Sequence, residues 1–183
     1  MRQLTLLLSL FLMVLFAKEP QIIHGHQLPP EPDPVVNDST LLGIDVNENG
    51  VRADVEIWIL NKYKDHHKIV SEIALQMGRA YQIVIADPAN AKETYKYIDA
   101  AQDCNFYFLD DAEEFGDPIL IDHVILNNEF KNIQLNTEVR VKAYLKHDQL
   151  LSGGVYRLTP IDESKAKWIL MLMNCWRNRN EII

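Results

Sequence analysis

Apolar residues recur at the spacing of an α-helix along most of this chain. The repeat is longest between Ile69 and Val84, where apolar side chains fall three or four residues apart over four turns. Alternation of apolar and polar residues, which is typical of strands, is sustained nowhere in the 183 residues. The pattern therefore predicts an all-α domain of five to six antiparallel helices joined by short connections.

Capping residues and helix breakers indicate where these helices begin and end. Asp87-Pro88 ends the longest apolar repeat, because proline cannot continue a helix. Asn136 or Thr137 is suited to cap a later helix that runs towards Gly153-Gly154. The remaining helices are expected at about 55–63, 91–109, 119–130 and 162–175.

The N-terminus has the pattern of an export signal. Arg2 precedes a largely apolar run at 4–16, which has the length of a signal-peptide core and is short for a membrane span. We expect cleavage after Ala17, which would leave the chain periplasmic or secreted and free of the membrane. An uncleaved anchor is the alternative.

Proline and charge complete the expected organisation. Four prolines among residues 28–34 favour an extended tether. We therefore expect a signal peptide at 1–17, a proline-rich tether at 18–34 and a single helical domain at 35–183. The net charge of −8 would repel the phosphates of a nucleic acid, so nucleic acid is excluded as a partner.

The chain has two cysteines, Cys104 and Cys175, in neither a CxxC motif nor a Cys/His cluster. In an oxidising compartment two such residues most simply form a disulfide with each other. Two buried thiols are the alternative interpretation.

Residues 45–56 read D-V-N-E-N-G-V-R-A-D-V-E and match the calcium-loop pattern D-x-[DN]-x-[DN]-G-x5-E at every fixed position. Alternate side chains of such a loop converge on one point, and Gly50 supplies the sharp turn. Hard oxygen ligands favour Ca2+ over zinc. An Asn-Gly turn before an N-capped helix is the alternative. The expected ligands are the side chains of Asp45, Asn47, Asn49 and Glu56 and the carbonyl of Val51, with Asp54 or a water at Ala53 filling the ninth position.

Two features suggest a solitary loop. The residues before Asp45 are poor in helix formers, so no entering helix is expected, and Arg52 replaces the usual aliphatic residue at the eighth position. The loop therefore resembles dockerin and thrombospondin type 3 calcium loops more than a paired EF-hand. With only Asp45 and Glu56 charged in its core, we expect a Kd of about 10⁻⁵ to 10⁻³ M.

The segments GIDVNENGVRADVE and AYLKHDQLLSGGVY resemble a family of short, uncharacterised exported bacterial proteins with a GIDxDxDGVRxDV-type loop. The resemblance implies an exported helical domain with a calcium loop and a disulfide, and it implies no activity. This chain departs from the pattern at Asn47, Asn49 and Ala53, where acidic residues are typical.

Two functions remain open from the sequence. The first is a non-enzymatic module that binds Ca2+ and another envelope or extracellular protein, since no GxSxG, P-loop or dinucleotide motif is present. The second is an envelope hydrolase with the calcium loop as scaffold and a catalytic group among Glu113, Glu114 and His123.

Histidines offer weaker metal candidates. His66-His67 could join His123 or His147 in a zinc site, but no HExxH motif or spaced Cys/His set is present, and we favour their interpretation as the polar start of the second helix. His24 and His26 in the tether could bind a metal weakly.

Overall fold

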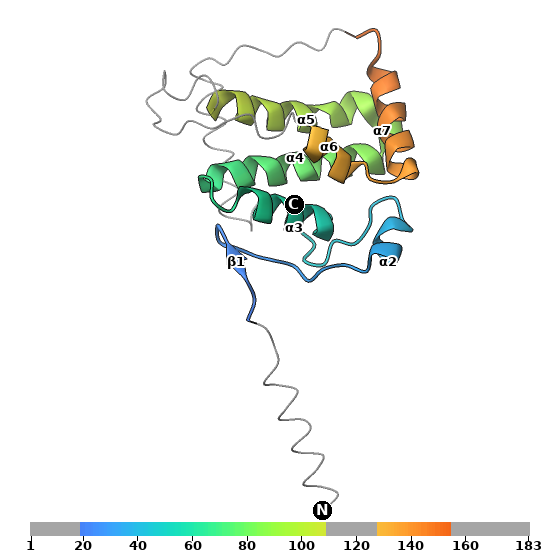
Figure 1. Ribbon diagram of the computed structural model, residues 1–183. Helices are drawn as coiled ribbons and strands as arrows, with labels where there is room; N and C mark the ends of the chain where they lie inside the picture. The colour runs from blue at the N-terminus through green and yellow to red at the C-terminus, as the bar shows by residue number, and fades with distance from the viewer. Residues whose placement is uncertain (1–18, 109–127, 155–183) are drawn as a thin grey trace, which may run out of the picture.

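The computed structural model describes residues 19–108 and 128–154 (Figure 1). Within these ranges the chain is mostly helical, so the expectation of an all-α fold is confirmed. Its elements are β1 (Ile22–Ile23), β2 (His26–Gln27), α2 (Pro34–Asp38), α3 (Ala53–Tyr63), α4 (Lys68–Ala86), the short 3₁₀ helix η1 (Pro88–Asn90), α5 (Ala91–Phe106), α6 (Asn128–Gln134) and α7 (Glu138–Leu151).

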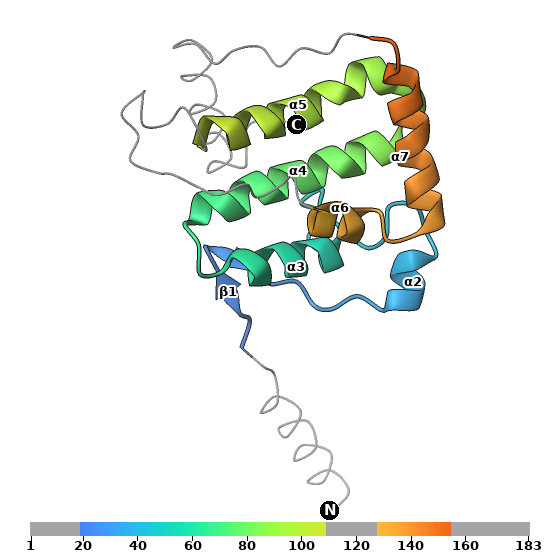
Figure 2. The same cartoon turned by 45° about the horizontal axis from the view of Figure 1, so that its top comes forward.

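Helix α4 forms the centre of the core. In both views it lies between α3 and α5, which run alongside it (Figures 1 and 2). The buried side chains of α4 follow the three- and four-residue spacing of the predicted stripe, and burial of this apolar face is what stabilises the helix. They include Val70, Ile73, Ala74, Met77 and Tyr81.

Helix α7 closes one end of the domain, where it crosses the ends of α4 and α5, and α6 lies against α3 and α4 (Figure 2). Phe130 of α6 is fully buried and packs edge-on against Trp58 of α3 at 5.9 Å between ring centroids. Thr137 caps α7 by accepting the backbone N–H of Arg140 at 3.4 Å. Of the helix expected at 119–130 only its last three residues are described, and the helix expected at 162–175 lies outside the described residues.

Residues 19–34 differ in part from the expected tether. Strands β1 and β2 form a short antiparallel hairpin that contacts α4. Ile23 is buried in the core, and hydrogen bonds join His24 Nδ1 to Ser71 Oγ at 2.9 Å and His26 Nε2 to Glu72 Oε1 at 2.8 Å. Burial of one isoleucine and these two polar contacts hold the hairpin on the helical domain, whereas the proline-rich residues up to Asp33 have no regular structure.

Some expectations concern segments that lie wholly or partly outside the described residues. No helix in the described ranges is long and apolar enough to cross a membrane. Cys104 is buried in α5, while Cys175 lies outside the described residues, so their pairing stays a prediction. The expected signal peptide at 1–17 also lies outside these ranges.

Candidate metal centre

The backbone of the 45–56 loop curls around the carboxylate of its first residue. Asp45 accepts the N–H of Asn49 at 3.2 Å and the N–H of Gly50 at 2.7 Å. Gly50 has a φ of +79°, the left-handed conformation expected at the sixth position. The amide of Ala53 donates to the carbonyl of Ile44 at 2.7 Å, which joins the ninth position of the loop to the residue before its first.

Glu56, the twelfth residue, points into the loop from the first turn of α3. Its residue surface is 1% exposed. The Nδ2 groups of Asn47 and Asn49 donate to Glu56 Oε2 at 3.1 and 2.7 Å. In the described part of the chain the carboxylate hydrogen-bonds only to these two amides. The third, fifth and twelfth side chains, all predicted ligands, therefore converge on one point.

The donor set fits a hard cation in type. Rotation of the Asn47 amide by half a turn about its last side-chain bond exchanges its nitrogen and oxygen, so Asn47 can offer an oxygen beside the carboxylate of Glu56. The same rotation of Asn49 would first have to break the hydrogen bond that its Oδ1 accepts from the N–H of Val51. No group of three or more His, Cys, Asp or Glu side chains within the described ranges is arranged to hold a metal. In the core of the loop only Asp45 and Glu56 are acidic, and the other two expected side-chain ligands are the amides of Asn47 and Asn49.

The other expected ligands have different surroundings. The side chain of Val51 is fully buried and faces Gly78 of α4, while its N–H donates to Asn49 Oδ1 at 2.8 Å. Asp54 is turned to Arg52, whose Nε and Nη2 donate to its two carboxylate oxygens at 2.6 and 3.1 Å. Because this ion pair occupies Asp54, a water is the better candidate for the ninth position.

Arg52 connects the loop to α6. Its side chain is fully buried, and its Nη2 and Nη1 donate to the carbonyls of Ile133 at 2.6 Å and Gln134 at 3.2 Å. These carbonyls belong to the C-terminal end of α6, where a cation is favoured by the helix dipole and by the unpaired acceptors. Arg52 at the eighth position thus anchors the loop to the helical domain, where paired EF-hands use an aliphatic residue.

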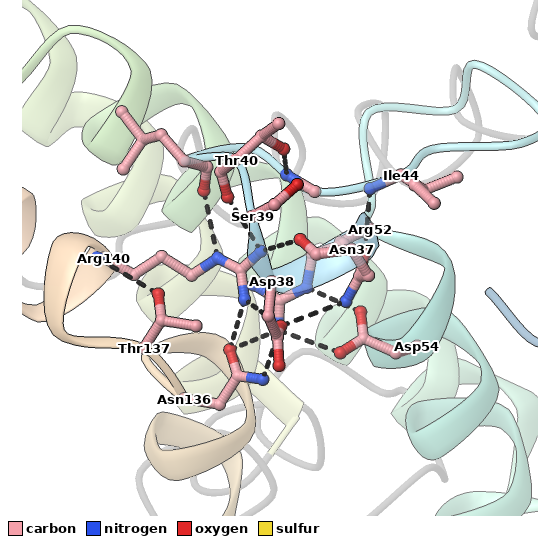
Figure 3. Close-up of polar contacts among 12 residues, drawn as sticks. Asn37, Asp38, Ser39, Thr40, Ile44, Arg52, Asp54, Asn136, Thr137 and Arg140 are labelled. Carbon is pink, nitrogen blue, oxygen red and sulfur yellow. Dashed lines mark hydrogen bonds and ion pairs between the residues drawn. The ribbon is translucent and has the colours of Figure 1, made fainter. Parts of the chain in front are cut away.

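A second buried arginine holds the segment before the loop. Arg140 of α7 donates from Nη2 to the carbonyls of Asn37 at 2.6 Å and Thr40 at 3.1 Å, and from Nε to Leu41 at 3.0 Å (Figure 3). Its Nη1 also donates to the carboxylate of Asp38 at 2.8 Å. A single side chain therefore provides hydrogen-bond donors for three backbone carbonyls of the segment before the loop.

Asn136 lies between the two arginines. Its Oδ1 accepts from Arg140 Nη1 at 2.5 Å and from Arg52 Nη2 at 3.2 Å, and its Nδ2 donates to Asp38 Oδ1 at 3.2 Å (Figure 3). We call the set Asp38, Arg52, Asp54, Asn136 and Arg140 the arginine clasp. The charges of the two buried arginines are balanced by the two partly exposed carboxylates of Asp38 and Asp54.

Burial and pairing act in opposite directions on the pKa of Asp38. Burial raises this pKa, but hydrogen bonds from Arg140 and Asn136, together with the charges of Arg140 and Arg52, outweigh it and hold the pKa below its usual value. Asp38 therefore stays ionised and paired at neutral pH.

Gly43 packs against Arg52 of the clasp at a position that has no room for a side chain. It has a φ of +70°, and a Cβ there would lie 2.3 Å from Cδ of Arg52 and 2.6 Å from Oδ1 of Asn37. That Asn37 oxygen accepts the N–H of Ile44 at 2.9 Å. Only glycine allows the chain to pass so close to the buried guanidinium stem.

The remaining candidates do not join this centre. His67 caps α4 by accepting the N–H of Ile69, which supports its interpretation as the polar start of that helix. His147 is buried in α7, and His24 and His26 contact Ser71 and Glu72. The proposed catalytic groups Glu113, Glu114 and His123 lie outside the described residues.

Sequence reasoning missed the roles of Arg140 and Asn136. Arg140 stands four residues before Tyr144 and so shares a helical face with it, and that position was its only signal in the sequence.

Comparison of the chain with known protein families, curated proteins and solved structures finds no match.

Proposed function

We propose that residues 45–56 form a calcium-binding loop that fixes the N-terminal segment against the helical domain of an exported protein. The single observation that carries the proposal is the buried carboxylate of Glu56, which is hydrogen-bonded to two asparagine amides and forms no ion pair with a described residue. The guanidinium of Arg79 is also close to the loop, but its Nε donates to the carbonyl of Asn49. A buried charge costs free energy unless it is paired or coordinates a metal. Bound Ca2+ would offset this cost by pairing with the carboxylate. Its oxygen ligands would be the side chains of Asp45, Asn47, Asn49 and Glu56 and the carbonyl of Val51.

The role that follows is structural, and the protein would act by binding another envelope or extracellular protein. The loop is connected to α6 and to Asn136 through Arg52, so an ion held at 45–56 would stabilise the same region that the clasp holds. Modest affinity suits a compartment outside the cytoplasm, where calcium-binding modules have a Kd of about 10⁻⁴ to 10⁻³ M.

The test is calorimetric titration of chelator-treated protein with Ca2+, combined with thermal unfolding. Saturable heat is expected, and at ten times its Kd calcium should add about 1.4 kcal/mol to the free energy of unfolding. Glu56→Gln should abolish both effects, because it removes the charge at the twelfth position. Glu48→Gln is the matched control, since Glu48 is an exposed residue at a non-ligand position of the same loop and should leave binding unchanged. A wild-type protein without calcium heat and without a shift in Tm would refute the proposal.

A gain-of-function variant separates a metal loop from a simple turn. Asn47→Asp with Asn49→Asp should lower stability in chelator, because two carboxylates replace the amide donors of Glu56 and repel it. With calcium present the same variant should bind more tightly than wild type, since affinity rises with the number of charged ligands. A turn without metal would be destabilised equally in chelator and in calcium.

A further inference from the structure

A cleft lies between the middle of α5 and the C-terminal half of α7. Its volume is about 350 Å³, within the size range of small-molecule sites. On each helix the lining positions follow the three- and four-residue spacing of one helical face, so the two helices turn matching faces to the same space. The lining includes Ile98, Asp99 and Gln102 of α5 and Tyr144, His147 and Asp148 of α7.

The charged side chains that line the cleft are acidic. Asp99 and Asp148 come from different helices, and none of the described residues around the cleft is Lys or Arg. Tyr144 also lines the cleft, and its ring is fixed in place by stacking on Tyr81 at 5.5 Å between centroids and by the ammonium of Lys131 at 4.7 Å from its centroid. The cleft therefore offers negative charge beside aromatic and aliphatic surface.

His147 adds a buried polar atom that has no partner in the described part of the chain. The residue is 4% exposed, and its Nε2 is buried without a hydrogen bond to any described residue. Burial lowers the pKa of His147 and the charge of Asp148 offsets this only in part, so the imidazole is neutral at pH 7. A neutral imidazole nitrogen can accept a hydrogen bond, and folded proteins rarely leave such an atom unpaired.

We propose that this cleft binds an organic cation, namely an ammonium or guanidinium group on a short apolar chain. The positive charge would pair with Asp99 and Asp148, one of its N–H groups would donate to Nε2 of His147, and the chain would lie against Ile98 and Tyr144. The same chemistry is found in a free amine or guanidine and in the Lys or Arg side chain of another protein. The site is independent of the calcium loop, which lies on other elements.

The experiment is a titration of the full chain with n-butylguanidinium, followed by ¹⁵N-resolved NMR and calorimetry. Saturable binding is expected, with shifts confined to residues around the cleft, whereas n-butanol and butanoate should not bind. Asp148→Asn should weaken binding about tenfold or more, the loss expected for one charge-assisted hydrogen bond. A blocked arginine dipeptide tested beside butylguanidinium distinguishes the two sources, because tighter binding of the peptide identifies a protein side chain as the ligand.

Controls keep the test independent of folding. Asp148 is exposed on α7, so its neutral variant should keep the helix, which circular dichroism can check. Glu93→Gln changes an exposed carboxylate of α5 that does not line the cleft and should leave binding unchanged. Equal affinity for n-butanol, equal affinity in Asp148→Asn, or no saturable binding would each overturn the proposal.

Discussion

The 45–56 loop and the arginine clasp lie next to each other but are built in different ways. Every expected calcium ligand comes from twelve consecutive residues, whereas Arg140 reaches Asp38 across 102 positions and Arg52 reaches Asn136 across 84. The geometry of a local motif follows from the spacing of its own residues. A long-range contact forms only when the helices pack together, so residue spacing in the sequence does not predict it.

The two regions also differ in how their charges are balanced. In the clasp both buried arginines have carboxylate partners and backbone acceptors. In the loop the buried carboxylate of Glu56 has only amide donors among the described residues. The clasp is therefore complete as a protein structure, whereas the loop would gain stability from the calcium ion that we propose it binds. Substitutions in the clasp should therefore lower the free energy of unfolding both with and without calcium. The effect of substitutions in the loop should depend on whether calcium is present.

The largest effect is expected for Arg140→Ala. This change removes a fully buried side chain and leaves the carbonyls of Asn37, Thr40 and Leu41 without their donor. Each buried polar group left unsatisfied costs about 1–3 kcal/mol, so the total loss should exceed about 3 kcal/mol. Urea unfolding in chelator measures the loss. Arg140→Lys should recover less than half of it, because an ammonium lacks the fork geometry.

The exposed pair of Lys142 and Glu138 on the same helix is the control for Arg140. Lys142→Ala should change the free energy of unfolding by less than about 0.5 kcal/mol, since solvent screens such pairs. If Arg140→Ala cost no more than Lys142→Ala, the clasp would have no structural importance.

An intermediate effect is expected for Gly43→Ala. The added methyl group meets Arg52 and the residue also has a positive φ, so strain and overpacking should together cost about 3 kcal/mol. Gly25→Ala is the matched control, because Gly25 has a φ of +90° but no described atom lies within 4 Å of the place where its Cβ would be. The control should cost about 1 kcal/mol. Equal losses in the two variants would show that contact with Arg52 is not the cause.

The smallest effect concerns acid. The pKa of Asp38 in the folded protein lies below its ordinary value of 3.8, so its ionised form favours folding. This contribution is complete above pH 3.8 and is lost as pH falls through the folded pKa. Because the side chain is 41% exposed, solvent screening should keep it below about 1 kcal/mol.

Urea midpoints measured from pH 7 to pH 2 compare wild type with Asp38→Asn. The difference between them should shrink as the carboxylate becomes protonated. A difference that stays constant across this range would mean that the charge of Asp38 does not support the clasp.

The sequence alone determined the helical class, the positions of α3, α4, α5 and α7, and the turn of the 45–56 loop, because each depends on spacing between near neighbours. It also identified Glu56 as an inward side chain from its place in a twelve-residue pattern. The hairpin at 22–27 was missed, because its two-residue strands are too short for a periodic signal and are held by contacts with α4.

Only the tertiary structure decided that Arg52 and Arg140 are buried, that Asn136 lies between them and that Asp54 faces Arg52 instead of the loop. It also decided that Asp99, His147 and Asp148 surround one cleft. The physical reason is the same in each case: the energy of a buried charge depends on partners from distant parts of the chain, and those partners meet only when the helices pack.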